Sequence, residues 1–269
     1  MSFLFYKMHG SGNDFILIDD RRKKFPLKDI SLIKNLTSRS EGIGSDGLIL
    51  LQDSKDCDLK MRFFNPDGLE QDMCGNGLRC ISKLANILNI CGNEIFVETN
   101  CGSIESKIKN NMVKLIFKFN FKTKLDVSLN NELRFDFCDS GVSHVVFWDE
   151  NINFDNFNTF CRKIRYHDFF KPNGTNVNIV RRASKDKLFI RTYERGVEEE
   201  TLSCGTGALA TAIISQEKNI CNFPIKVIPK SNDCLIVDKI EDKITLEGSV
   251  FFDYEGIWKN GNWYKSWVK

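Results

Sequence analysis

The sequence predicts an α/β (α+β) fold built from two similar halves. Short runs of β-branched and aromatic residues, bounded by Gly, Asn or Asp, dominate the chain and indicate strands, whereas few segments have helical spacing. The order of these segments also repeats. Asn13 precedes Cys74 by 61 residues and Val142 precedes Cys204 by 62, and this agreement indicates an internal duplication of about 120 residues.

Each expected element has a local reason. The segment 76–89 places Leu78, Ile81, Leu84, Ala85 and Leu88 at helical spacing before Gly92, and 206–218 is so rich in Ala and Ile that we expect a helix buried on most sides. The other two expected helices are 27–39 and 156–166. The expected strands are 15–18, 48–51, 60–64, 95–98, 113–119, 145–148, 178–180, 188–193, 225–228 and 244–246.

The repeat predicts two domains. The first covers residues 1–121 together with a C-terminal tail, 258–269, and carries Cys74. The second covers residues 122–257 and carries Cys204. We expect the aromatic tail, which contains Trp258, Trp263 and Trp267, to pack back onto the first domain. The alternative is an interaction surface.

Composition excludes several classes of protein. The net charge of +2 gives no global basic field for nucleic acid. No apolar run reaches the roughly 18–20 residues of a membrane span, and the N-terminus lacks the pattern of a signal peptide. We therefore expect a cytoplasmic protein whose ten cysteines are reduced. None of them forms a C-x-x-C pair, so we expect no metal site.

The segments "QDMCGNGLRC" and "EEETLSCGTGALA" place Cys74 and Cys204 before a Gly-x-Gly at the start of an expected helix. The first N–H groups of a helix lack intrahelical partners and attract anions, and a cysteine there can have a thiol pKa of roughly 3.5–7.5. One such motif alone is more typical of packing. Two in equivalent positions favour two thiols that face each other across one cleft between the halves.

Two opposed thiols suit the inversion of a stereocentre, because one removes a proton from one face of a carbon while the other delivers a proton to the opposite face. At the α-carbon of an amino acid, helix N-termini would also stabilise the charge that develops on the carboxylate. The sequence has no GxGxxG between a strand and a helix and no Walker A motif. We therefore expect no cofactor, although the sequence leaves a pyridoxal phosphate lysine open.

Five segments resemble the signatures of diaminopimelate epimerases: "KMHGSGNDFILID", "GIGSDGLIL", "FFNPDGLEQDMCGNGLRC", "GTNVN" and "YERGVEEETLSCGTGALA". The resemblance runs from Lys7 to about Gly248. It implies a cofactor-independent epimerase that interconverts LL- and meso-2,6-diaminopimelate in lysine and peptidoglycan precursor biosynthesis. It also implies two α/β domains, each a curled mixed sheet around a central helix, with the site between them, and a homodimer.

The resemblance assigns roles to particular residues. Cys74 and Cys204 match the proton donor and acceptor, and His144 and Glu194 match groups that assist the thiols. The backbone cradle for the reacting carboxylate matches Gly75, Asn76, Gly205 and Thr206, and the polar groups around the substrate match Asn13, Asn65, Asn176, Glu194 and Arg195. The chain departs from the family at three positions: some members carry Gln at Gly47 and Asn at Val142, and the usual proline is replaced by Ser143.

Structural explanations remain for several of these residues. A tight turn would explain Asn13, an exposed ion pair would explain Glu194 and Arg195, and His144 is flanked by apolar residues as structural histidines are. We expect Cys80 and Cys101 to be buried packing residues.

Two other functions compete with the epimerase. One is a proline- or hydroxyproline-type racemase of the same fold, whose smaller substrate would need fewer polar groups than Asn65, Asn176 and Arg195 provide. The other is a protein that binds an amino acid without chemistry, against which the presence of both cysteines argues.

Overall fold

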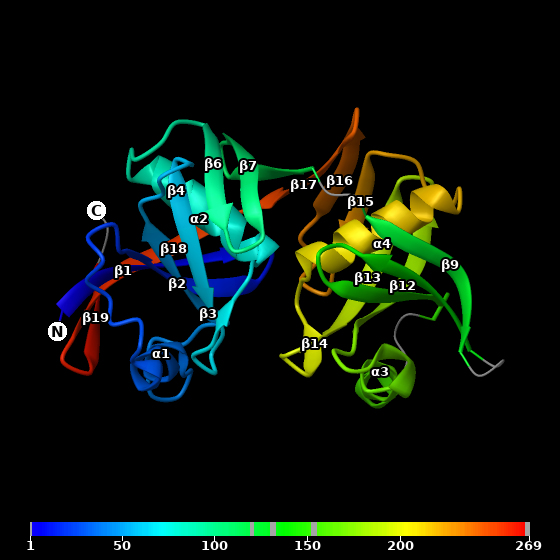
Figure 1. Cartoon of the computed structure of the whole chain (residues 1–269), viewed down its shortest axis with the longest axis horizontal. Helices are drawn as coiled ribbons and strands as arrows, with labels where there is room; N and C mark the ends of the chain where they lie inside the picture. The colour runs from blue at the N-terminus through cyan, green and yellow to red at the C-terminus, as the bar shows by residue number, and fades with distance from the viewer. Residues whose placement is uncertain (1, 119–120, 130–132, 152–154, 267–269) are drawn as a thin grey trace. The chain divides into compact units, whose positions relative to one another are not determined.

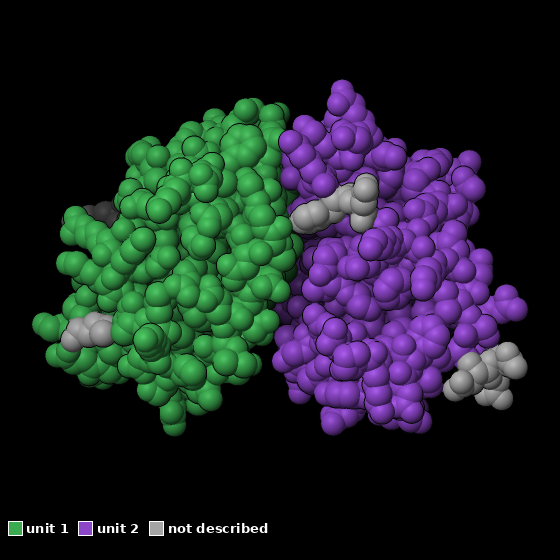
Figure 2. All heavy atoms as spheres, in the orientation of Figure 1, with its two compact units in different colours: residues 1–115, 248–269 green, residues 116–247 purple. Residues whose placement is uncertain are grey.

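The computed structural model describes residues 2–118, 121–129, 133–151 and 155–266 and divides the chain into two compact units. Unit 1 consists of residues 1–115 and 248–269, and unit 2 of residues 116–247 (Figure 2). The sequence-based boundaries, 121/122 and 257/258, lie further along the chain. The C-terminal boundary is earlier in the structure because strand β18, Phe251–Lys259, pairs with β1, Ser2–Gly10, from His9 back to Ser2.

Unit 1 contains a mixed sheet and two helices (Figure 1). Antiparallel pairing joins β19 to β18, β18 to β1 and β1 to β2, and β2 then pairs in parallel with β3. The strand β4 is antiparallel to β3 and parallel to β6, which forms a hairpin with β7. The bounds are β2 Asn13–Asp19, α1 Ile30–Thr37, β3 Gly47–Gln52, β4 Leu59–Phe64, β5 Glu70–Gln71, α2 Gly75–Ile87, β6 Glu94–Thr99, β7 Gly102–Lys109, β8 Met112–Phe117 and β19 Asn262–Ser266.

Unit 2 repeats this topology. The strands β9, β10 and β11 are antiparallel, β11 pairs in parallel with β12, β13 is antiparallel to β12, and β13 is parallel to β15, which leads through β16 to β17. The bounds are β9 Lys122–Leu129, β10 Leu133–Asp139, β11 Ser143–Trp148, α3 Phe157–Arg165, η1 Asp168–Phe170, β12 Asn176–Ser184, β13 Lys187–Glu194, β14 Glu199–Thr201, α4 Gly205–Glu217, β15 Ile225–Ile228, β16 Leu235–Ile240 and β17 Lys243–Ser249.

The register of the two units corresponds residue by residue near the parallel crossover. Phe15 of β2 lies opposite Gly47 of β3, and His144 of β11 lies opposite Asn176 of β12. In both units a short helix, α1 or α3, connects these two parallel strands, as a parallel pair requires. The internal duplication predicted from the spacing is therefore present in the topology.

The helices α2 and α4 are the centres of their units. The helix α2 packs against β1, β2, β3, β4, β6 and β7, and α4 packs against β10, β11, β12, β15 and β16. A helix that contacts so many strands of one sheet requires that sheet to curl around it. Nearly every position of α4 from Gly205 to Ser215 is buried, as its Ala- and Ile-rich sequence predicts. The predicted fold class is confirmed.

All four predicted helices are present, with ends shifted by one to three residues. The ten predicted strands are present too, although the predicted strand 113–119 reaches Phe119, which lies outside the described residues. Several strands were missed, and β1 explains why: Phe5, Tyr6, Lys7 and Met8 are buried in succession and give no alternating pattern. None of the helices in the described ranges is long and apolar enough to cross a membrane.

The aromatic tail packs onto unit 1, as expected. Trp258 is buried and stacks on Phe3 with a ring separation of 5.1 Å. The indole N–H of Trp263 donates to the carbonyl of Gly42 at 3.2 Å. Trp267 lies outside the described residues. The tail therefore completes the core of unit 1.

The central helices also end alike, and this gives a prediction. Asn89 and Asn219 have φ values of 54° and 56° after the last turn, and the N–H of the next residue, Ile90 or Ile220, bonds back to a carbonyl of that turn. We expect Asn89→Ala and Asn219→Ala each to lower the free energy of unfolding by about 1 kcal/mol, because alanine tolerates positive φ less well. Urea unfolding will measure this. The control variants Asn89→Gly and Asn219→Gly should lose less, and an equal loss for Gly and Ala would contradict the explanation.

Candidate active site

Cys74 and Cys204 occupy the same place in the two units, immediately before the central helix. Both residues are extended, with φ and ψ of −135° and 118° for Cys74 and −124° and 112° for Cys204. The N–H of Gly77 donates to the sulfur of Cys74 at 3.5 Å. Each cysteine therefore precedes the positive end of a helix dipole, whose first N–H groups also suit a carboxylate.

In unit 1 the predicted residues Asn13, Cys74 and Asn76 come together. The Oδ1 atom of Asn13 accepts from Nδ2 of Asn76 at 3.2 Å and lies 3.8 Å from the sulfur of Cys74. Asn13 begins β2 directly after the tight turn at Ser11 and Gly12, both of which have positive φ. Asn13 therefore both follows the tight turn and lies beside the Cys74 thiol, so the structural explanation and the site role apply to the same residue.

Two groups that the sequence reasoning missed hold this arrangement. The fully buried guanidinium of Arg79 donates to Oδ1 of Asn76 at 2.6 Å. The carboxylate of Asp46 accepts from Nδ2 of Asn13 at 2.8 Å. The spacing of three residues between Asn76 and Arg79 on a helix was a usable signal for their contact.

A charged cluster lies next to this network. Asp14 contacts Lys7 at 2.5 Å and Arg39 at 2.7 Å, and Arg39 also contacts Asp46 at 2.6 Å. Burial alone would raise the pKa of Asp14, but the hydrogen bonds from Arg39 and Lys7 outweigh burial and lower the pKa to about 2. Asp14 is therefore ionised at neutral pH and ties the start of β2 to β1 and to the segment after α1.

Other predicted residues of unit 1 lie at element ends. Asn65 follows β4 and opens a turn in which its N–H donates to the carbonyl of Leu69 at 3.0 Å. Gly75 is the first residue of α2 and is buried. The N–H groups of Gly75 and Asn76 therefore belong to the first turn of α2, as a carboxylate cradle would require.

In unit 2 a chain of polar side chains leads to Cys204. The hydroxyl of Thr206 lies 3.4 Å from the sulfur of Cys204 and 3.0 Å from Nε2 of His144. The other ring nitrogen of His144 lies 3.1 Å from Nδ2 of Asn178, a residue that the sequence analysis quoted within "GTNVN" but did not assign. Burial lowers the pKa of His144 to about 3, so the imidazole is neutral.

The remaining predicted residues of unit 2 lie at strand ends and at the start of α4. The amide of Asn176 accepts from the N–H of Arg195 at 2.8 Å through Oδ1 and donates to the carbonyl of Ser143 at 3.0 Å through Nδ2. Glu194 is the last residue of β13, directly before Arg195, and Gly205 is the first residue of α4. Hydrogen bonds thus link Asn13 to Cys74 and Thr206 to Cys204, and a separate one links Asn176 to Arg195.

The structure explains two of the three departures from the family pattern. A Cβ atom at Gly47 would lie 2.5 Å from the ring of Phe63 and 2.8 Å from the carbonyl of Phe64, so a glutamine cannot enter without moving β4. The hydroxyl of Ser143 donates to Thr175 at 2.8 Å, a bond that proline cannot form. Val142 lies in the turn before β11, where its carbonyl accepts from Ser140 at 3.1 Å.

The two other cysteines singled out from the sequence behave differently. Cys80 is fully buried, as expected, and burial raises the pKa of its thiol. The expectation that Cys101 is a buried packing residue is wrong: it is exposed in the turn between β6 and β7. A hydrophobic residue type does not prevent exposure at a hairpin turn.

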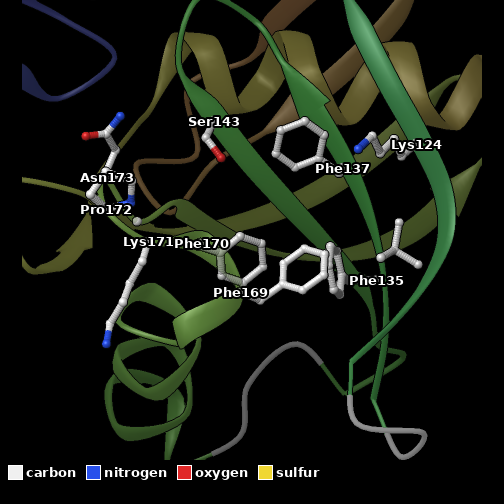
Figure 3. A pocket seen from close by; sticks show the side chains of 11 residues that line it. Lys124, Phe135, Phe137, Ser143, Phe169, Phe170, Lys171, Pro172 and Asn173 are labelled. Atoms are coloured by element: carbon white, nitrogen blue, oxygen red, sulfur yellow. The ribbon is translucent and has the colours of Figure 1, made fainter.

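Unit 2 also contains a pocket of about 300 Å³ beside β9, β10 and the segment after α3 (Figure 3). The rings of Phe135, Phe137, Phe169 and Phe170 make it mainly aromatic. Among the described residues that line it, none is a predicted catalytic or substrate-binding residue. The start of α4 therefore remains the candidate site of this unit.

Comparison with known proteins agrees with the duplicated architecture. The family model described as diaminopimelate epimerase matches the chain twice, over residues 5–120 and 137–252. A diaminopimelate epimerase of Aquifex aeolicus is 39% identical over 268 residues, which cover 94% of this chain and 96% of that relative.

Solved structures share the fold at low sequence identity. A phenazine biosynthesis protein of the PhzF family from Bacillus anthracis has a TM-score of 0.72 with 14% identity and full coverage of both chains. A hydroxyproline epimerase from Agrobacterium vitis has a TM-score of 0.70 with 14% identity, covering 95% of this chain and 92% of that one. These two likenesses establish the fold alone.

The charged cluster around Asp14 predicts a pH dependence of stability. Its pKa in the folded chain, about 2, is below the ordinary value of 3.8, so its contribution is present above about pH 4 and is lost as the pH falls toward 2. We expect Asp14→Asn to lower the free energy of unfolding at pH 7 by about 2 kcal/mol. Urea unfolding from pH 7 to pH 2.5 should show this difference shrinking. A difference independent of pH would contradict the assignment.

Proposed function

This chain belongs to the diaminopimelate epimerase family, and we propose that it interconverts LL- and meso-2,6-diaminopimelate by proton transfer between the substrate and the thiols of Cys74 and Cys204. One observation carries the catalytic assignment. In two units of the same topology, the residue at the start of the central helix is a cysteine. A duplicated fold keeps a reactive residue type at both equivalent positions most simply when the reaction uses both.

The proposed reaction needs one thiolate and one thiol. One sulfur removes the α-hydrogen as a proton, and the other donates a proton to the opposite face of the same carbon. The electron pair of the broken C–H bond is delocalised into the α-carboxylate, which the N–H groups of Gly75, Asn76, Gly205 and Thr206 would bind. Turnover leaves the two sulfurs with exchanged protonation states, so the same pair serves both directions.

The second amino-acid head of diaminopimelate calls for further polar groups. We assign this role to Asn65, Asn176, Glu194 and Arg195, together with Asn13. A guanidinium suits a carboxylate, and a glutamate suits an ammonium group. The bond from the Arg195 N–H to Asn176 supports this grouping, since it holds one binding residue against another. His144 and Glu194 assist the thiols.

We place the reaction in the cytoplasm, in lysine and peptidoglycan precursor biosynthesis. All ten cysteines are free thiols, as a reducing compartment would leave them. The reaction scheme needs no cofactor, because the helix N-termini supply the stabilisation of negative charge that a cofactor would otherwise provide.

We also propose a homodimer formed through one face of the β1, β18 and β19 sheet. Leu4 lies opposite Ile257, and Ile257 lies opposite Tyr264, so the three side chains form one row across three strands. They are 41%, 45% and 62% exposed. A contiguous apolar row of this kind suits a self-complementary contact about a twofold axis.

The roles of the thiols can be tested by isotope exchange. In ²H₂O, the wild-type protein should exchange the α-hydrogen of LL- and meso-diaminopimelate, whereas Cys74→Ala and Cys204→Ala should each lose epimerisation by more than about a thousandfold, as expected for loss of general acid–base catalysis. NMR will follow both exchange and isomer composition. The control variant Cys80→Ala should stay active. Epimerisation at the wild-type rate in either alanine variant would refute the scheme, and turnover of L-proline instead would identify a different substrate.

The dimer has its own test. Ile257→Asp should shift the mass measured by light scattering from that of two chains to that of one, because a buried aspartate would be unpaired. The matched control is Ile240→Asp, since Ile240 is similarly exposed, at 47%, but belongs to unit 2. A dimer that persists in Ile257→Asp would place the interface elsewhere.

A further inference from the structure

We propose that Asn178 is a positioning residue that fixes the tautomer of His144 and, through Thr206, places the negative charge of the resting enzyme on Cys204 rather than on Cys74. The inference deepens the proposed function, because it states which of the two thiols acts as the base when the enzyme is free. It depends on hydrogen bonds within each unit separately.

The orientation of the Asn178 amide is determined by its neighbours. Its Nδ2 atom lies 2.9 Å from the carbonyl of Val145, which can only accept, and its Oδ1 atom accepts from the hydroxyl of Thr192 at 3.0 Å. The group that faces Nδ1 of His144 at 3.1 Å is therefore the NH₂ group. Nδ1 must accept, so the single ring proton of neutral His144 is on Nε2.

This tautomer sets the direction of the next two hydrogen bonds. Nε2–H of His144 donates to the hydroxyl oxygen of Thr206 at 3.0 Å. The proton of that hydroxyl is then available to the sulfur of Cys204 at 3.4 Å. A hydroxyl that donates to sulfur stabilises the thiolate relative to the thiol.

In unit 1 the side chain that faces the sulfur presents a hydrogen-bond acceptor rather than a donor. Arg79 can only donate, so Oδ1 of Asn76 faces it and Nδ2 of Asn76 faces Asn13. The carboxylate of Asp46 can only accept, so Nδ2 of Asn13 faces Asp46. The atom of Asn13 that faces the sulfur of Cys74 at 3.8 Å is therefore Oδ1, an acceptor. The N–H of Gly77 donates to the same sulfur at 3.5 Å, but only the S–H form of Cys74 can donate to Oδ1 of Asn13, so this acceptor favours the thiol.

Comparison of the two units shows which buried pair of side chains differs between them. Ile49 pairs with Phe63 in unit 1, and the corresponding pair in unit 2 is Asn178 with Thr192, since Gly77 faces Ile49 as Gly207 faces Asn178. All four side chains are buried. A buried polar pair is costly unless its hydrogen bonds are satisfied, so the replacement of an apolar pair by this one indicates a role beyond packing.

Gly207 in the first turn of α4 leaves room for the side chains of Asn178 and Thr192. A Cβ atom at Gly207 would lie 2.7 Å from Oδ1 of Asn178 and 3.3 Å from the hydroxyl of Thr192. The glycine thus lets these side chains of β12 and β13 lie close to the first turn of α4. Glu194 ends the strand that carries Thr192 and Arg195 follows it, and the charge of Arg195 adds to burial in keeping His144 neutral.

The test uses the free protein and no substrate. The protein is alkylated with iodoacetamide from pH 5 to pH 10, and peptide mass spectrometry gives a separate pH midpoint for each thiol. The accessibility of a thiol changes its alkylation rate but not this pH midpoint. We expect the midpoint of Cys204 to be below that of Cys74. Asn178→Leu, which places an apolar side chain there as Ile49 does in unit 1, should raise the Cys204 midpoint by about one unit, a tenfold change, and leave that of Cys74 unchanged.

A second set of variants covers the case in which Asn178→Leu does not fold. Thr206→Val should raise the Cys204 midpoint as well, and Thr206→Ser, which keeps the hydroxyl, should restore it. Thr211→Val is the matched control, because Thr211 is buried in the same helix away from the relay. A Cys74 midpoint below that of Cys204, or a Cys204 midpoint unaltered in folded Asn178→Leu or Thr206→Val, would overturn the proposal.

The outcome of the alkylation experiment does not depend on the outcome of the isotope-exchange experiment. Failure of the two-thiol scheme appears as epimerisation that survives in Cys74→Ala or Cys204→Ala. Failure of the present inference appears as alkylation midpoints in the wrong order or insensitive to the relay.

Discussion

The site in each half depends on one constraint: the unpaired N–H groups at the start of a buried central helix. Because α2 and α4 are enclosed by the strands of their own units, the position of each first turn is fixed by the whole core. The cysteine directly before each first turn is extended, and in unit 1 its sulfur accepts from the N–H of Gly77. A carboxylate and a thiolate are stabilised there for the same electrostatic reason, so binding and reactivity come from one structural feature.

The duplicated halves support this feature with different chemistry. In unit 1 the supporting groups are charged: Arg79 orients Asn76, and Asp46 orients Asn13. In unit 2 the corresponding support is neutral and passes through His144, Asn178 and Thr206. The backbone of the two halves can stay alike while side chains beneath the helix set the polarity at each sulfur. Duplication thus supplies two equivalent cysteine positions, and substitution of the side chains around each cysteine makes them inequivalent.

The sequence was sufficient for the features that are local. The Leu and Ile spacing of α2 and the Ala-rich character of α4 are visible in the chain, and so is the Cys-Gly-x-Gly that precedes each helix. The features that were missed depend on contacts between distant segments. Asn178 acquires its role only because β12 pairs with β11 and brings it to His144, 34 residues earlier, and the unit boundary depends on the pairing of β18 with β1. Cys101 was misjudged because residue type alone does not report a hairpin turn.

A reversible two-thiol reaction limits how strongly either sulfur can be biased. A charged partner such as a protonated histidine would hold one sulfur as the thiolate and slow the return of its proton. Burial keeps His144 neutral, so the bias at Cys204 comes from a hydroxyl hydrogen bond instead. Such a bond contributes about 1.4 kcal/mol, roughly a tenfold preference. That is enough to give the resting enzyme a preferred base and small enough that the other protonation state stays populated, as catalysis in both directions requires.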